Sequence, residues 1–155
     1  METTRCVIYH LREKKTDETK ILFLQKAQES KNPFAFELPG GKMFDSFWQR
    51  LLYWFSPRKR QRDLQVKNLI REVQEETGIL LDEEEVHFLG DKEYVNPATR
   101  RLTRVHQFFV MLDRIPQVQL GDFQEDKHSG FSWFSLREYE KLVPCGVISE
   151  NSKIL

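Results

Sequence analysis

The sequence predicts an α/β fold in which a mixed β-sheet lies between helices. Segments rich in β-branched and aromatic residues occur both before and after an amphipathic helical segment, and a shorter helical segment follows the last of them. The 155 residues fit one domain spanning 1–155, which is large enough to bury about two-thirds of the surface that the unfolded chain exposes.

The first part of the chain predicts three strands. Residues 5–10 and 21–25 carry β-branched and aromatic side chains, and a charged loop around residues 14–18 joins them as a hairpin. Residues 35–38 predict a short third strand that leads into the sequence Pro39-Gly40-Gly41. Glycines allow the backbone to approach a ligand closely, so this turn is a candidate part of a binding site.

The central helix is predicted over residues 64–77. Asp63 is a candidate N-cap, and Gly78 stands where a left-handed residue ends many helices. Positions three and four apart share a helix face, and the apolar ones predict a stripe that packs on a core. These apolar residues are Val66, Leu69, Ile70 and Val73.

The remainder of the chain predicts three further strands and a second helix. Residues 86–95 contain a strand that breaks at Asn96-Pro97. Residues 102–112 give the strongest strand signal and are too apolar to be half exposed. Residues 129–134 form the last predicted strand, and the Ser135 that follows can cap a helix running to residue 142.

Three glutamates distinguish the central helix. With about 100° of rotation per residue, Glu72, Glu75 and Glu76 fall within a sector of roughly 100°. Such a face is often simply a solvated acidic surface. The Gly40-Gly41 turn upstream supports a second interpretation, because carboxylates beside backbone oxygens suit a hard divalent cation.

The segment Arg71-Glu72-Val73-Gln74-Glu75-Glu76-Thr77-Gly78-Ile79 resembles the second half of the signature of the Nudix hydrolase family, G-x5-E-x7-R-E-U-x-E-E-x-G-U with U aliphatic. The first half departs from it, because Asp63 replaces the glutamate and Pro57 stands where the glycine belongs. The glycine pair lies further upstream, so we expect an insertion of about 16 residues, at about 43–62, between the turn and the helix.

The resemblance implies an α/β/α sandwich and a metal-dependent pyrophosphohydrolase. By the same resemblance, its cofactor would be Mg²⁺ or Mn²⁺, and its substrate would be a nucleoside diphosphate derivative: a nucleotide, a dinucleoside polyphosphate or a nucleotide sugar. Glu72, Glu75, Glu76 and a carbonyl of Gly41 or Gly40 would hold the metal. Glu72 would alternatively activate water, and Arg71 would orient the glutamates through Asp63.

Residues outside this helix are also candidates for substrate binding. Arg58 and Arg60 belong to the basic run just before the predicted helix and suit phosphate groups. Glu125 or Asp126 would supply a late carboxylate to the site, or Lys127 would contact phosphate; an ordinary solvated loop is the alternative. Tyr94 is a candidate for contact with a base.

The 43–62 segment contains a predicted helix that begins at Asp45 or Ser46 and ends at Ser56-Pro57. Its apolar side chains are too numerous for one narrow stripe. The helix therefore packs on its own domain, covers the site as a lid, or buries itself in a second subunit as a homodimer.

Composition excludes several classes of protein. Lys plus Arg and Asp plus Glu balance at 24 each, so no overall field favours nucleic acid. Two cysteines fit reduced thiols in the cytoplasm, and no apolar run approaches a membrane span. Because of the basic run, an RNA 5′-end pyrophosphohydrolase is an alternative function. Because the signature is disrupted, a non-catalytic Nudix-like module that binds a nucleotide is a second alternative.

Overall fold

The computed structural model describes residues 1–10, 19–28, 34–44, 46–96, 100–113, 115–121 and 128–155. The strands form one mixed sheet in the order β3-β2-β1-β5-β4, with β6 paired to β2. Its strands are β1 (Glu2–His10), β2 (Lys20–Lys26), β3 (Phe36–Glu37), β4 (His87–Val95), β5 (Leu102–Leu112) and β6 (His128–Ser135). The helices are α1 (Phe47–Trp54), α2 (Arg58–Thr77), α3 (Leu136–Leu142), and the 3₁₀ turns η1 (Glu83–Glu85) and η2 (Glu150–Ser152).

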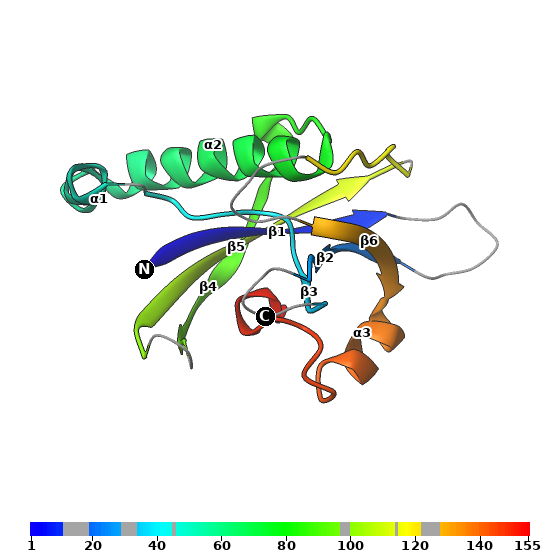
Figure 1. The fold of residues 1–155 in the computed structure, drawn as a ribbon. Helices are drawn as coiled ribbons and strands as arrows, with labels where there is room; N and C mark the ends of the chain where they lie inside the picture. The colour runs from blue at the N-terminus through cyan, green and yellow to red at the C-terminus, as the bar shows by residue number, and fades with distance from the viewer. Residues whose placement is uncertain (11–18, 29–33, 45, 97–99, 114, 122–127) are drawn as a thin grey trace.

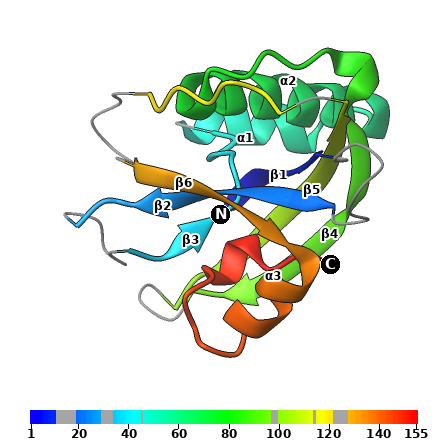
Figure 2. The ribbon, with the colours of Figure 1, turned by 90° about the vertical axis from the view of Figure 1, so that its right-hand side faces the viewer.

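The predicted sandwich is confirmed. Helix α2 covers one face of the sheet, and α3 with the C-terminal segment covers the other (Figures 1 and 2). Beneath α2, the buried side chains of Leu69 and Val73 pack on Phe108 of β5. On the opposite face, Phe23 stacks on Tyr139 of α3 with ring centroids 5.7 Å apart. All six predicted strands are present, although the boundaries of most differ by a few residues.

The sheet opens where the glycine turn enters it. Among the residues that the structure describes, strands β1 and β2 pair at Tyr9–Ile21 and His10–Lys20. Beyond this point, the backbone of the turn pairs with β1: Cys6 N donates to Pro39 O (2.8 Å), and Thr4 N donates to Gly41 O (2.9 Å). The edge of β1 that β2 leaves free therefore fixes the position of the turn.

The predicted start of the central helix is wrong. Helix α2 begins at Arg58 with Pro57 as its N-cap, so Asp63 lies inside it and caps nothing. The basic residues that follow Pro57 are good helix formers, and Gln61 N already donates to Pro57 O (3.0 Å). The predicted end is confirmed, because Gly78 has a φ of +70°.

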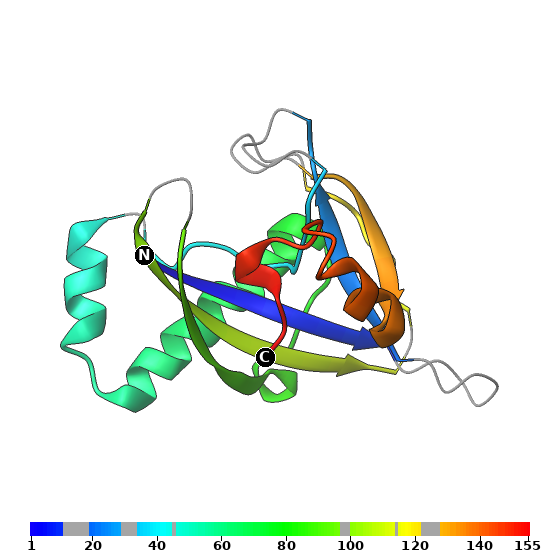
Figure 3. The ribbon, with the colours of Figure 1, turned by 90° about the horizontal axis from the view of Figure 1, so that it is seen from below.

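Helix α1 lies beyond the N-terminal end of α2 (Figure 3). Ser46 caps it through a reciprocal pair of bonds with Gln49, as predicted, whereas Asp45 lies outside the described residues. Tyr53 is its one buried residue, packing on Phe44 at 4.9 Å between ring centroids and accepting a bond from Gln65 of α2. The indole of Trp54 donates to Glu2 Oε1 (3.2 Å). These contacts attach α1 to its own domain.

Within the part of the chain that the structure describes, no helix has the length and apolar character needed to cross a membrane. Cys6 is buried and Cys145 is exposed, and both are free thiols.

We predict that Tyr53→Ala releases α1 without unfolding α2. Amide exchange in residues 47–56 should accelerate by about tenfold or more, because local opening depends on few buried contacts there. Exchange in residues 64–77 should be unchanged. Trp48→Ala is the matched control, since Trp48 is 70% exposed and should have no effect. Equal acceleration in both helices, measured by hydrogen exchange with mass spectrometry, would show that α1 is not a separately anchored element.

Candidate active site

Glu76 lies against the glycine turn. Its Oε2 accepts a hydrogen bond of 2.7 Å from Gly40 N. Burial raises the pKa of the Glu76 carboxyl well above its usual value, and the negative charge of Glu37 adds to this rise, although Arg5 acts in the opposite direction. A cation bound beside a carboxylate in such a position would stabilise its ionised form.

Glu72 lies one turn earlier on the same side of α2. A Cβ atom added to Gly41 would overlap the Glu72 carboxylate, so the lack of a side chain at Gly41 makes room for it. Gly40 is constrained differently: its φ is +134°, and an added Cβ would overlap the backbone oxygen of Thr4. Burial raises the pKa of Glu72 as well. The two glycines thus seat two carboxylates side by side.

A charged network that the sequence analysis missed supports the turn from behind. The buried Arg5 guanidinium bonds to Gly40 O and lies 3.5 Å from Glu37 Oε2. Glu37 also contacts Lys26 (3.2 Å) and His128 (3.0 Å). Burial alone would raise the pKa of Glu37, but Arg5, His128 and Lys26 together lower it to about 2. A charged residue between apolar Phe36 and Leu38 was the one sequence signal available for this network.

Arg71 reaches the glutamates directly and not through Asp63. Its guanidinium contacts Glu72 Oε1 and donates to Glu75 Oε2 (2.9 Å) and Asn68 Oδ1 (3.0 Å). Asn68 in turn donates to Thr4 Oγ1 of β1 (2.9 Å). Arg71 is therefore held in place by the sheet and itself holds two of the three glutamates.

The three glutamates divide between two environments. Glu72 and Glu76 face the glycine turn, while Glu75 pairs with Arg71 at the surface. Among the described residues, no three His, Cys, Asp or Glu side chains come together in the manner of a complete metal site. A cation at this turn would consequently need further oxygens from water or from a substrate, an arrangement that Mg²⁺ commonly adopts.

The candidates for substrate binding are not gathered at this site. Arg58 and Arg60 lie in the first turn of α2, and Arg60 is about 24 Å along the helix axis from Glu76. Tyr94 pairs with Thr103 of β5, so the two side chains lie on the same face of the sheet. Thr103 is five residues from Phe108, which packs beneath α2, and successive side chains of a strand point to opposite faces. Tyr94 therefore lies on the face of the sheet opposite α2. Glu125, Asp126 and Lys127 lie outside the described residues.

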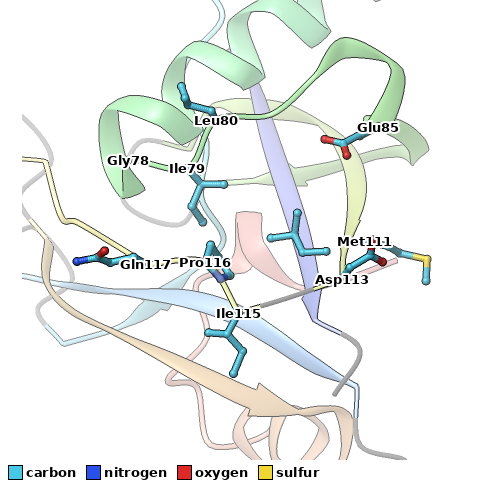
Figure 4. A pocket seen from close by; sticks show the side chains of 10 residues that line it. Gly78, Ile79, Leu80, Glu85, Met111, Asp113, Ile115, Pro116 and Gln117 are labelled. Atoms are coloured by element: carbon cyan, nitrogen blue, oxygen red, sulfur yellow. The ribbon is translucent and has the colours of Figure 1, made fainter. Parts of the chain in front are cut away.

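A hollow of about 530 Å³ lies beside the C-terminal end of α2. Figure 4 shows Ile79 and Pro116 on one side of it and Glu85 and Asp113 toward the other. The charged side chains among its described lining residues are both acidic. This hollow therefore does not suit a phosphate ligand.

The site therefore consists of the glycine turn, the Glu72 and Glu76 carboxylates that lie against it, and Arg71, which orients Glu72 and Glu75. A family model described as the NUDIX domain matches residues 3–147. The chain belongs to the Nudix hydrolase family. No curated protein sequence matches the chain.

Solved structures agree with the Nudix fold. A C. elegans Ap4A hydrolase has 18% identity and a TM-score of 0.61, covering 92% of this chain and 85% of that one. T. brucei MERS1 in complex with GDP has 16% identity and a TM-score of 0.63, covering 96% and 53%. A MutT/nudix family protein from Enterococcus faecalis has 19% identity and a TM-score of 0.61, covering 86% of this chain and 43% of that one. The chain thus spans less than half of the Enterococcus protein.

The Nudix signature helix and the glycine turn therefore meet in space even though 29 residues, 42–70, separate Gly41 from Arg71 in the sequence. The whole of α1 and the start of α2 lie between them in sequence. These elements extend away from the turn and leave Gly40 and Gly41 in contact with α2.

We predict that alanine has opposite consequences at the two Nudix glycines. Gly40→Ala should lower the free energy of unfolding by about 2–4 kcal/mol, because of its positive φ and the overlap with Thr4. Gly41→Ala should cost less than about 1.5 kcal/mol, because the flexible Glu72 side chain can move. That movement should lower turnover by about 100-fold. Urea unfolding and a phosphate-release assay measure the two effects, and full turnover in Gly41→Ala would mean that the position of Glu72 is unimportant.

Proposed function

We infer that this Nudix protein is a Mg²⁺- or Mn²⁺-dependent pyrophosphohydrolase that cleaves the diphosphate linkage of a nucleotide-type substrate. The observation that carries this proposal is the partly buried Glu76 carboxylate, bonded to Gly40 N with its pKa raised by burial. The Ap4A hydrolase and the GDP complex among the structural neighbours support a nucleotide as the class of substrate.

The residues of the turn fit a divalent cation. Glu76 and Glu72 offer carboxylate oxygens, and the Gly41 carbonyl, which accepts one bond from Thr4 N, keeps a second lone pair. Mg²⁺ keeps several waters and uses one or two carboxylates together with substrate phosphates. When bound, the cation would neutralise charge on the phosphate oxygens.

The protein side chains position the remaining chemistry. Water attacks one phosphorus of the diphosphate, and the bond from that phosphorus to the bridging oxygen breaks. Glu72 is the candidate to accept the proton of this water, since its raised pKa brings it closer to neutral pH. Arg71 holds the Glu72 and Glu75 carboxylates in place, and it does so with a planar fork that lysine lacks.

Two alternatives remain distinct from this proposal. A non-catalytic module would bind a nucleotide without Mg²⁺-dependent release of phosphate. An RNA 5′-end pyrophosphohydrolase would use the exposed basic residues of the first turn of α2, which only a ligand extending along the helix can reach. A screen of nucleotides, dinucleoside polyphosphates, nucleotide sugars and 5′-phosphorylated RNA with Mg²⁺ separates all three.

We predict that Glu76→Gln lowers turnover by about 100-fold or more, because the carboxylate charge at the turn is lost. The same variant should melt at a higher temperature than the parent when both are metal-free at pH 7. The raised pKa of Glu76 means that its ionised form destabilises the folded state above the unfolded value of 4.5. The difference in melting temperature between the variant and the parent should therefore decrease as the pH falls toward 4.5.

Calorimetry of both proteins in EDTA between pH 7 and pH 4.5 tests the stability difference, and a Mg²⁺-dependent assay tests turnover. Glu75→Gln is the control for stability, because Glu75 lies at the surface and forms an ion pair with Arg71. Near-normal turnover in folded Glu76→Gln would show that the metal ion does not bind at this turn.

A further inference from the structure

A groove of about 430 Å³ lies between α1, the N-terminal half of α2 and the residues that precede α1. It is distinct from the acidic hollow at the other end of α2. Its volume is in the range that holds one small ligand. The described residues that line it are Met43, Phe44, Gln49, Leu52, Tyr53, Ser56, Arg60, Leu64, Lys67, Asn68 and Arg71.

Three cations follow one line along this groove. Arg60, Lys67 and Arg71 are seven and four residues apart, which places them within about 40° of one another around α2. Along the helix axis they are separated by about 10 Å and about 6 Å. None of the described lining residues is acidic. The groove is therefore complementary to an anionic ligand with phosphates at more than one position.

The groove and the candidate active site share one residue, Arg71. Arg71, the last of the three cations, is the residue that contacts Glu72 and Glu75. Asn68 also lines the groove and bonds to Arg71 (3.0 Å). A diphosphate beside Glu72 and Glu76 would consequently continue past Arg71 toward Lys67.

The part of the groove between Lys67 and Arg60 is apolar. Leu52 of α1 is 71% exposed and Leu64 of α2 is 40% exposed, and both line it. Phe44 and Tyr53 pack on each other in the same place. Exposed apolar side chains between cations suit a ligand in which a flat ring with apolar faces branches from a backbone that carries a charged group on each side of the branch.

We propose that this groove binds a nucleoside that carries phosphate at both ends: the diphosphate to be cleaved at its 5′ position and a further phosphate at its 3′ position. The 5′-phosphates lie over Arg71 and Lys67, the base contacts Leu52 and Leu64, and Arg60 binds the 3′-phosphate. This assignment rests on the proposed function and specifies its substrate class. A 3′-phosphate belongs either to a small bis-phosphorylated nucleotide or to the next residue of an RNA 5′ end.

Binding of non-cleavable analogues tests this proposal independently of turnover. The probes are α,β-methylene nucleoside 5′-diphosphates of adenine and guanine, each with and without a 3′-phosphate, measured by titration calorimetry with Mg²⁺. Arg60→Glu should weaken binding of the 3′-phosphorylated probe by about tenfold or more, as expected for a lost charged hydrogen bond, and change the other probe by less than about twofold. Lys67→Glu should weaken both probes.

Matched controls separate the groove from general charge and surface effects. Lys59→Glu makes the same change one residue from Arg60, about 100° around the helix and outside the groove, and should alter neither affinity. Leu52→Asp should weaken both probes, whereas Trp48→Asp, at a residue equally exposed on α1, should not. The parent should also bind the 3′-phosphorylated probe about tenfold more tightly than the plain one.

Several results would overturn the assignment. Equal affinity of the parent for both probes, or an equal loss of affinity in Arg60→Glu and Lys59→Glu, would show that the groove does not bind a 3′-phosphate. If the parent binds neither probe, the groove is not a nucleoside site. If the parent hydrolyses diphosphates but the groove variants bind both probes as tightly as the parent does, this inference is wrong and the proposed function stands. If the probes bind as expected but no diphosphate is hydrolysed, the proposed function is wrong and the groove assignment stands. A 5′-diphosphorylated dinucleotide that outcompetes the 3′-phosphorylated mononucleotide assigns the 3′-phosphate to RNA.

Discussion

The rest of the site depends on the close contact between the Gly40-Gly41 turn and helix α2. A carboxylate can occupy the position of Glu76 only because Gly40 N donates to it, and Glu72 has space only because Gly41 lacks a side chain. Behind the turn, Arg5 binds the Gly40 carbonyl and is balanced by Glu37. The result is a fixed backbone turn with negative charge gathered on one side and positive charge on the other.

This contact is a consequence of how the sheet is built. Strands β1 and β2 separate beyond the Tyr9–Ile21 pair, and the edge of β1 that becomes free pairs with the turn. Helix α2 is held over the same part of β1 by buried side chains and by the bond from Asn68 to Thr4. The same strand therefore positions both halves of the site, and the elements between them in sequence can extend outward as α1 without disturbing it.

The sequence was sufficient to predict the strands, the end of α2 and the caps of α1 and α3, because each depends on a local pattern. It did not predict the start of α2, because residues 58–62 form helix as readily as loop once Pro57 provides a beginning. The network of Arg5, Glu37 and His128 comes from three strands and depends on which strands pair. Tyr94 is on the opposite face because pairing shifts at a bulge between Phe88 and Gly90.

The central claim is that the turn and the glutamates of α2 together bind a divalent cation. Crystals of the protein soaked in Mn²⁺ would show its position directly by anomalous scattering. We expect one strong peak in contact with the Glu76 carboxylate and the Gly41 carbonyl, with Glu72 bound directly or through water. A peak at the acidic hollow beside Glu85 and Asp113, with none at the glycine turn, would contradict the account.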